Sequence, residues 1–365
     1  MSVLKGFEKG IGIGGWLTNY KRFTAVPKDR VYDLTVGDLE HFESYITVKD
    51  VLYISALGAD HIRLCFDQVV LEEAPFVYRK RPFELINEFV KWCEKVREKK
   101  DLSVVFNLHK AIGNYCDVSE DISLFDSREL CDRFVALWVE IEKRFADKPF
   151  IAFELLNEVR DVAPNGWNAL AERTVNAIRE LNPDRKIFIG GTHWGDVDKV
   201  DTIKIFDDPN VFYTFHFYKP FEFTHQQGVL QANTAYYNRR MEYPAPVDKY
   251  RDYRECIGGD PCVYDGFEFI DKEYLRAQLS PVIEFKKAHP DRVIACTEFG
   301  TIRHCNSRYR ENWMRDLVSL FKEYDIPYCA WNYCSAPYDG NKFSLVDDDT
   351  RRILSSQLAK AIFPK

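Results

Sequence analysis

The sequence predicts an α/β fold of the closed (β/α)8 type, the TIM barrel, on three observations. Strand-like and helix-like segments alternate along all 365 residues. Eight such pairs follow one another without an internal repeat or a phosphate-binding turn. Hydrophobic residues make up 46% of the chain and charged residues 29%, which is ordinary for a globular protein with a large core. No linker rich in Pro, Gly or Ser divides the chain, so we expect a single domain over 1–365.

Short apolar runs mark the expected strands, and they end near Ile13, Cys65, Leu108, Leu156, Ile189, Phe217, Cys296 and Trp331. Apolar residues recur with helical spacing at 38–57, 83–100, 127–145, 167–181, 197–206, 272–289, 306–324 and 351–361. The helix at 127–145 has the clearest start signal. Asp126 is its expected N-cap, and Glu129 follows three residues later, as in a capping box.

The glycine-rich opening, Gly10 to Gly15, superficially resembles the phosphate-binding turn of an open, doubly wound sheet. That alternative requires a helix directly after the glycines and an acidic residue at the end of the second strand. Trp16 and Leu17 follow the glycines instead, and no acidic residue ends a clean second strand. The doubly wound alternative is therefore rejected.

One connection is much longer than the others. More than fifty residues separate the strand that ends near Phe217 from the helix expected at Lys272. We define residues 219–271 as the insertion, which follows the sixth strand and is rich in Tyr and Phe. Loops of this length in a barrel are commonly functional. The insertion either walls one side of the substrate cleft or packs on itself, and the two interpretations have equal weight.

Charge and composition exclude several partners. A net charge of −7 argues against nucleic acid, which requires a concentrated basic surface. No apolar run approaches the roughly 18 residues needed to span a membrane. The amino terminus lacks the pattern of a secretory signal, so we expect a cytoplasmic protein, or a secreted one if the chain is a mature form.

Cysteine usage agrees with a reducing compartment. We expect most of the ten cysteines to be reduced thiols, with Cys256 and Cys262 as the one pair suspected of bridging. No C-x-x-C pair and no H-E-x-x-H motif is present, so neither a metal site nor a cofactor is expected. The acidic run 347–349 lacks the spacing of a calcium loop and is interpreted as a solvated turn.

Polar and aromatic residues gather where the expected strands end, namely Arg63, His109, Asn157, Glu158, His216, Tyr218, Glu298 and Trp331. A barrel places all of these strand ends around one rim. Two carboxylates on such a rim suit glycoside hydrolysis, in which one protonates the leaving oxygen and the other attacks the anomeric carbon or activates water. The carboxylate near Arg63 and a Tyr hydroxyl is expected to stay ionised, which leaves the other available as the acid.

The motifs at these strand ends resemble those of glycoside hydrolase family 5, the large cellulase family of the (β/α)8 clan. They are Leu155-Leu-Asn157-Glu158, Thr297-Glu298-Phe299-Gly300, His216-Phe-Tyr218, Leu108-His109 and Ala330-Trp331, with Gly10 to Leu17 as the first strand. The resemblance runs from Gly10 to Lys365. It implies retaining hydrolysis, with Glu158 as the acid/base and Glu298 as the nucleophile.

The same resemblance implies a role for each remaining residue. Asn157 would bond the sugar 2-hydroxyl, Tyr218 and Arg63 would orient Glu298, and His216 would lie near Glu158. His109 would bind sugar hydroxyls and Trp331 would form the platform under the sugar. The structural alternative is that Arg63 and His109 are buried hydrogen-bonding partners and Trp331 is core. Three further residues, Trp16, His193 and Trp194, are either sugar contacts or packing residues.

The resemblance favours a β-1,4-glucan or its oligosaccharides as the substrate, with endo action, partly from the segment Phe221 to Gln226. A β-mannanase, a xyloglucan-active enzyme or an exo-acting β-glucosidase on short oligosaccharides are the alternatives. Two alternatives belong to other functional classes: an inactive carbohydrate-binding barrel, and a metal-dependent isomerase or hydrolase.

Overall fold

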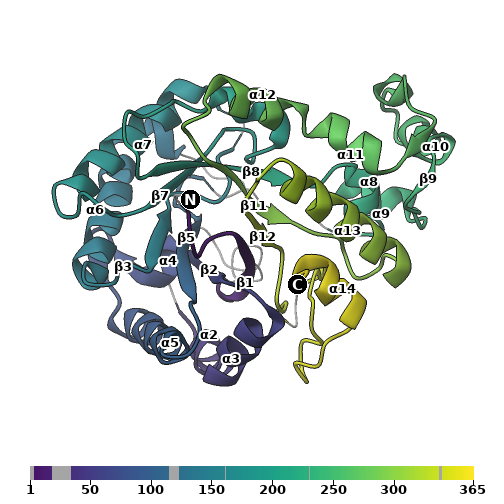
Figure 1. Ribbon diagram of the computed structural model, residues 1–365. Coiled ribbons are helices and arrows are strands. Elements are labelled where there is room, and N and C mark those ends of the chain that lie inside the picture. Colours follow the sequence, from purple (N-terminus) through teal and green to yellow (C-terminus); the bar gives the residue numbers. More distant parts are fainter. Residues whose placement is uncertain (1–3, 19–33, 115–122, 161, 230, 337–338) are drawn as a thin grey trace.

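Eight parallel strands close into a barrel in the computed structural model, which describes residues 4–18, 34–114, 123–160, 162–229, 231–336 and 339–365. The strands are hydrogen-bonded in the order β1-β12-β11-β8-β7-β6-β5-β2, and helices surround them (Figure 1). The (β/α)8 prediction is confirmed. The barrel strands are β1 (Lys9–Leu17), β2 (His61–Asp67), β5 (Ser103–Lys110), β6 (Ile151–Glu154), β7 (Ile187–Gly190), β8 (Val211–Phe217), β11 (Ile294–Phe299) and β12 (Tyr328–Ala330).

The outer helices bury apolar faces against the barrel. They include α2 (Val36–Ser44), α3 (Val48–Leu57), α4 (Gln68–Leu71), α5 (Lys80–Arg97), α6 (Arg128–Phe145), α7 (Pro164–Arg179), α11 (Lys272–Gln278), α12 (Ser280–Ala288), α13 (Ser307–Glu323) and α14 (Ser356–Ile362). The 3-10 segments are η2 (Leu124–Asp126), η3 (Val197–Thr202) and η4 (Pro261–Tyr264), and β3 (Glu72–Ala74) pairs with β4 (Val77–Tyr78). Among the described residues, no helix combines the length and the apolar character that crossing a bilayer requires.

Four helix predictions need correction. The expected helix at 38–57 is two helices, because the Thr47 N–H and hydroxyl both donate to Asp50 at 2.8 Å and start α3 afresh. The helix at 272–289 divides near Pro281, which has no N–H to continue α11. Residues 197–206 form only the short 3-10 segment η3. The N-cap of α6 is Ser127, whose hydroxyl accepts from Leu130 N at 3.3 Å, and Asp126 belongs to η2.

An apolar cluster fills the lower part of the barrel, formed by Leu4, Phe7, Val105, Ala152, Phe188, Phe212 and Ala295. Side chains alternate along a strand, so the later inward positions along β5, β6 and β8 lie in higher layers. Those positions carry the polar side chains of the candidate site. The core cluster therefore forms the floor on which the site is built.

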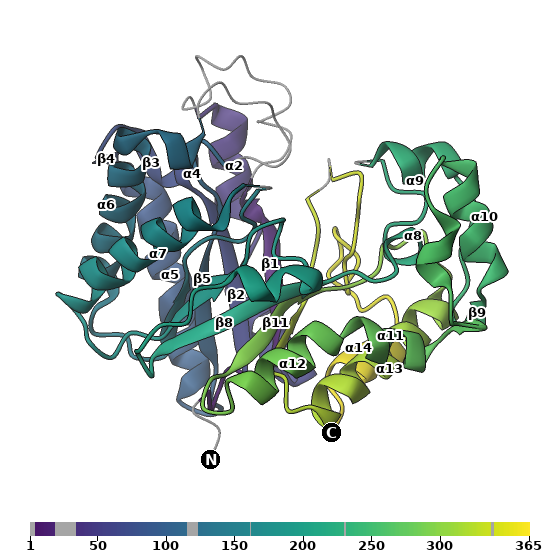
Figure 2. The ribbon, with the colours of Figure 1, turned by 90° about the horizontal axis from the view of Figure 1, so that it is seen from above.

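The insertion contains α8 (Phe221–Thr224), α9 (Ala232–Tyr237), β9 (Ala245–Pro246), α10 (Asp248–Cys256), η4 and β10 (Phe269–Ile270). It lies to one side of the barrel, next to α11 and α13 (Figure 2). Its aromatic rings contact one another, as in the Tyr250–Tyr264 and Tyr237–Tyr253 pairs at 5.7 and 4.8 Å between ring centroids. It also reaches the rim, where His225 packs on Tyr218 at 4.9 Å. The segment thus has an aromatic core of its own and also contacts Tyr218 of the site through His225 and through the Thr224 hydroxyl, which donates to the Tyr218 carbonyl at 2.8 Å.

The suspected disulfide is absent, because Cys256 and Cys262 are both free and exposed. The other described cysteines are also free thiols, and Cys116 lies outside the described residues. The solvated-turn interpretation of 347–349 is wrong for its central residue. The Asp348 carboxylate is 6% exposed and accepts from Arg303 at 2.8 Å and Lys342 at 2.9 Å.

Candidate active site

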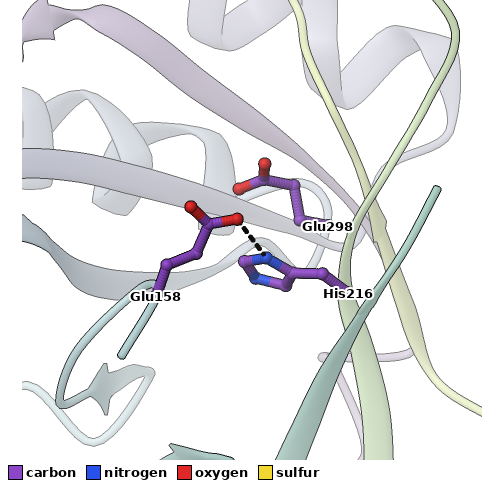
Figure 3. Close-up of side chains that lie close together, drawn as sticks. All are labelled: Glu158, His216 and Glu298. Carbon is purple, nitrogen blue, oxygen red and sulfur yellow. Dashed lines mark hydrogen bonds and ion pairs between the residues drawn. The ribbon is translucent and has the colours of Figure 1, made fainter. Parts of the chain in front are cut away.

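The carboxyl ends of the strands bring all eight predicted residues to one rim. Arg63 lies in β2, His109 in β5, His216 in β8 and Glu298 in β11, while Asn157, Glu158, Tyr218 and Trp331 directly follow β6, β8 and β12. Figure 3 shows Glu158, His216 and Glu298 facing one another. One oxygen of each carboxyl group and one ring nitrogen of His216 lie within 4.8 Å of one another.

Both oxygens of Glu298 are held by neighbouring donors. The Arg63 Nη1 donates to Oε2 at 3.0 Å, and the Tyr218 hydroxyl donates to Oε1 at 2.8 Å. The Glu298 side chain is only 8% exposed. Burial raises its pKa above the ordinary value, although the nearby positive charges of His216 and Arg63 act in the opposite direction. The carboxylate is therefore immobilised, and burial outweighs its cationic neighbours.

The Glu298 side chain points inward because β11 contains an extra residue. Cys296 pairs with Phe215 and Glu298 pairs with His216, so Thr297 has no counterpart in β8. Ala295 belongs to the cluster inside the barrel, and strict alternation from it would direct Thr297 inward and Glu298 toward the helices. Such a bulge re-aims the side chains that follow it, and bulges are frequent beside active sites. The register shift thus places the carboxylate in the site.

The Glu158 carboxyl group is more open to solvent than Glu298, with 26% of its side chain exposed. Its Oε1 accepts from His216 Nδ1 at 3.1 Å. A residue that we did not predict supports its backbone. The Asn114 amide donates to the Glu158 carbonyl at 2.7 Å and accepts from Arg160 N at 3.1 Å. No motif distinguishes Asn114 in the sequence, because only the fold brings its loop against Glu158.

The two histidines of the site respond differently to burial. Desolvation disfavours the charged form of His216, but Glu298 and Glu158 outweigh it and raise the His216 pKa above its ordinary value. Burial lowers the His109 pKa well below its usual range, and the charges of Arg63 and Lys110 add to that effect. His109 is therefore neutral near pH 7, and it stacks parallel to Trp331 with ring centroids 5.4 Å apart.

The first strand is glycine-rich because two large rings pack against it. A Cβ on Gly14 would lie 2.3 Å from the Trp331 ring, and a Cβ on Gly10 would lie 2.1 Å from the His61 ring. Both glycines are needed for this close approach. Together with Cys65, Ile302 and Phe343, Trp331 forms a small apolar cluster at the rim, with Tyr218 packed against it. The indole thus has a fixed position at the rim, beside Tyr218.

The three further residues singled out in the sequence, Trp16, His193 and Trp194, have different environments in the structure. Trp16 is fully buried and its Nε1 donates to the Phe42 carbonyl at 2.7 Å, so it is a packing residue. Trp194 is 45% exposed, and its backbone N–H donates to the Val159 carbonyl at 2.7 Å. His193, Trp194 and Gly195 have successive positive φ values of 57°, 58° and 66°. This strained backbone fixes an exposed indole beside the Glu158 loop.

Glu158, His216 and Glu298 offer the donor atoms of a metal site, but their surroundings do not suit one. Both Glu298 oxygens already accept hydrogen bonds, from Arg63 and from Tyr218. The Arg63 guanidinium is itself a cation 3.0 Å from the carboxylate. A divalent ion would have to displace or repel that charge. The cluster therefore fits an organic substrate better than a metal.

Another residue that we did not predict lies beneath the site. The Glu154 side chain in β6 is fully buried, and its Oε2 accepts from Arg63 Nε at 2.5 Å. The sequence did contain a signal for it. A carboxylate in the middle of a buried apolar strand is costly unless it has a partner. The apolar character of the surrounding run hid that signal.

Comparison with known proteins agrees with this geometry. Residues 39–337 match the model of the cellulase family, glycosyl hydrolase family 5. Endoglucanase C of Acetivibrio thermocellus is 32% identical over 363 residues, which cover 98% of each chain. Cellodextrinase A of Ruminococcus flavefaciens is 33% identical over 327 residues, 88% of this chain and 84% of that protein. The solved structure of Thermotoga maritima Cel5A with mannotriose has a TM-score of 0.72 at 24% identity, covers 98% of each chain and supports the fold.

Proposed function

The chain belongs to glycosyl hydrolase family 5, the cellulase family, and we propose that it is an endo-β-1,4-glucanase that works by double displacement. The observation that carries this proposal is the approach of Glu158 and Glu298, with oxygens of the two carboxyl groups within 4.8 Å. Retaining glycosidases hold their carboxyl groups about 5–5.5 Å apart, whereas inverting ones need about 6.5–9.5 Å to admit a water molecule. The separation favours retention.

In the first step, a Glu298 oxygen attacks the anomeric carbon as the glycosidic bond breaks. The leaving oxygen takes the proton of Glu158, so that the released sugar departs as a neutral alcohol. The buried position of Glu298 suits the nucleophile, and the greater exposure of Glu158 suits a group that exchanges protons with a leaving alcohol and with water. The product is a glycosyl ester on Glu298.

In the second step, Glu158 is the base that takes a proton from water. The water oxygen attacks the anomeric carbon, the ester bond to Glu298 breaks, and Glu158 regains its proton. The sugar leaves with the configuration it had in the substrate, because the carbon has been inverted twice. His216, bonded to Glu158 at 3.1 Å, orients this carboxyl group in both steps.

The remaining residues bind and orient. Arg63 and Tyr218 hold the two Glu298 oxygens, so the carboxylate cannot rotate away from the anomeric carbon. Asn157 bonds the sugar 2-hydroxyl, where a contact can strengthen in the transition state. Neutral His109 binds hydroxyl groups, and Trp331, which stacks parallel to His109, is the platform for the sugar being cleaved.

The acid limb of the pH profile is expected to lie above the ordinary glutamate pKa of about 4.3. Glu298 must be ionised to attack, and its raised pKa means that activity falls as the pH drops through that raised value. The measurement is kcat/KM against pH on an aryl β-cellobioside. An acid limb at or below the ordinary value in the wild type would contradict the electrostatics described here.

Endo action is tested on a soluble β-1,4-glucan. Viscosity should fall well before reducing ends accumulate, because internal cuts shorten long chains first. EDTA should leave the rate unchanged, since the mechanism uses two carboxylates and no metal. Parallel incubations with β-mannan and xyloglucan test the substrate class. Faster cleavage of mannan, or an activity that EDTA removes and a divalent ion restores, would overturn the proposal. Tight oligosaccharide binding without product release would identify a binding barrel instead.

A second candidate is cleavage of short cellodextrins, favoured by the similarity to Cellodextrinase A over 88% of the chain. The two candidates share the mechanism and differ in the length of substrate. They are distinguished by kcat/KM on cellotriose to cellohexaose compared with the soluble polymer. A cellodextrinase releases reducing ends from the short oligosaccharides at a high rate and hardly lowers polymer viscosity. An endoglucanase shows the reverse preference.

A further inference from the structure

Glu154 is a third carboxylate of the site, which neither the family motifs nor the mechanism above uses. It is fully buried, in contrast to Glu158, and its Oε2 contacts the Nε of Arg63 at 2.5 Å. We propose that Glu154 is a positioning residue, which holds the Arg63 guanidinium in place and keeps it from pairing exclusively with the nucleophile Glu298. This inference rests on the proposed function, because it concerns the role of Arg63 in that reaction.

The Arg63 guanidinium has three edges, and each faces a different partner. Nε donates to Glu154, Nη1 to Glu298 at 3.0 Å and Nη2 to the Asn157 side-chain oxygen at 2.5 Å. The planar fork has a fixed geometry, so the orientation of one edge sets the other two. Arg63 is itself 1% exposed. Holding Nε at Glu154 therefore aims the remaining nitrogens at the nucleophile and at the residue expected on the sugar 2-hydroxyl.

The charge of Glu154 has an effect separate from its position. With Glu154 ionised, one guanidinium is shared between two carboxylates, and neither receives its full stabilisation. Without that charge, the whole attraction of Arg63 would fall on Glu298. The nucleophile would be more stable as an anion and less reactive in the ground state. Glu154 thus limits how strongly Arg63 restrains the attacking oxygen.

The titratable groups around Glu298 come from every neighbouring element. Strand β2 contributes Arg63 and Cys65, β6 contributes Glu154, and Glu158 follows β6. Strand β8 contributes His216, Tyr218 follows it, and Cys296 and Cys329 come from β11 and β12. His109 of β5 lies near Arg63 and His216. Of these groups, Glu154 forms its ion pair with Arg63, and its Oε1 has no hydrogen-bond partner among the described residues. A change at Glu154 therefore reaches Glu298 through Arg63.

The chain offers a matched control in a second buried pair. Glu142 of α6 is fully buried and accepts from Arg185 Nε at 2.7 Å, and the Arg185 side chain is 1% exposed. The Arg185 guanidinium also donates to the Phe145 and Ile151 carbonyls at the outside of the barrel. The two pairs share residue types and burial, but only Arg63 also contacts the site. A merely structural role for Glu154 would make the two replacements behave alike.

The test compares Glu154→Gln, Glu154→Asp and Glu142→Gln with the wild type on an aryl β-cellobioside. For E154Q, kcat should fall about 10- to 100-fold with a small change in KM, as expected from a slight misplacement of reacting groups. Its acid limb should move to lower pH by about half a unit or more, because Glu298 then faces an uncompensated Arg63. E154D keeps the charge, so its acid limb should match the wild type while kcat falls. E142Q should lower the Tm and leave both kcat and the pH profile unchanged.

The results separate the inference from the function on which it rests. If the wild type cleaves no β-glucoside, the proposed function fails whatever the variants do. If the wild type is active and folded E154Q shows the wild-type kcat and acid limb, the positioning role fails. If E154Q does not fold, E154D decides: wild-type kcat per folded molecule, measured beside thermal denaturation, would also overturn the role.

Discussion

Replacing Glu298 by Gln is expected to lower kcat/KM on β-1,4-glucan by on the order of 10⁴-fold or more, the scale seen when a catalytic nucleophile is removed. The amide oxygen can still accept from Arg63, and the amide nitrogen can donate to the Tyr218 hydroxyl oxygen, so the site should keep its shape. It cannot form the glycosyl ester, because an amide oxygen is a poor nucleophile. The measurement is the initial rate of release of reducing ends, beside a thermal unfolding curve that confirms the fold.

A second Glu298 variant identifies the atom that attacks. Glu298→Gly opens space beneath the anomeric carbon, and azide added at high concentration should restore cleavage of an activated aryl β-cellobioside. The expected product is the α-glycosyl azide, since a single displacement by the small anion inverts the carbon. Recovery of the β-azide, or undiminished activity of E298Q, would remove Glu298 from the role of nucleophile. Glu142→Gln, a buried glutamate outside the rim, is the control and should retain full activity.

Replacing Glu158 by Gln should produce a loss that depends on the leaving group. On β-1,4-glucan, where the departing alcohol needs a proton, the rate should fall about 10²- to 10⁴-fold. On 2,4-dinitrophenyl β-cellobioside the first step needs no proton, so a rapid burst of phenolate should precede slow turnover. The burst arises because the glycosyl ester on Glu298 accumulates when no base activates water. Stopped-flow absorbance measures both phases.

Azide provides the matching check for Glu158. In Glu158→Ala it should accelerate turnover of the dinitrophenyl substrate and yield the β-glycosyl azide, because it attacks the ester without general base assistance. A variant that loses equal activity on glucan and on the dinitrophenyl substrate, with no burst, would show that Glu158 does not protonate the leaving oxygen. His216, which bonds Glu158 at 3.1 Å, would then become the residue to test next.

Most of the barrel could be predicted from the sequence because its strands are short, apolar and separated by amphipathic helices. The missed boundaries had local causes. The capping interaction of Thr47 with Asp50 divides the expected helix at 38–57. Apolar residues recur with helical spacing across the break, so the sequence pattern did not reveal it. Pro281 divides the helix at 272–289 in the same way. In each case a side chain or a missing N–H overrode a continuous hydrophobic pattern.

The rim residues could be predicted for a different reason. Polar groups that directly follow buried strands must lie at the carboxyl edge of a closed parallel barrel, whatever their separation along the chain. Asn114 and Glu154 were missed, since one acts through a backbone carbonyl and the other lies within an apolar run. Trp16 illustrates the opposite difficulty. From the sequence, an aromatic residue at a strand end is equally consistent with a sugar platform and with a core residue. Only the full burial of Trp16 in the structure identifies it as core.

The sequence in and just after the strands thus determined the chemical inventory of the site: two carboxylates, a guanidinium, two imidazoles, a phenol, an amide and an indole. Only the tertiary structure decided how these groups are oriented. The extra residue Thr297 turns Glu298 inward, and the shared Arg63 joins Glu298 to the buried Glu154. The physical reason is that strand register and buried ion pairing depend on contacts between distant segments, which local composition does not encode.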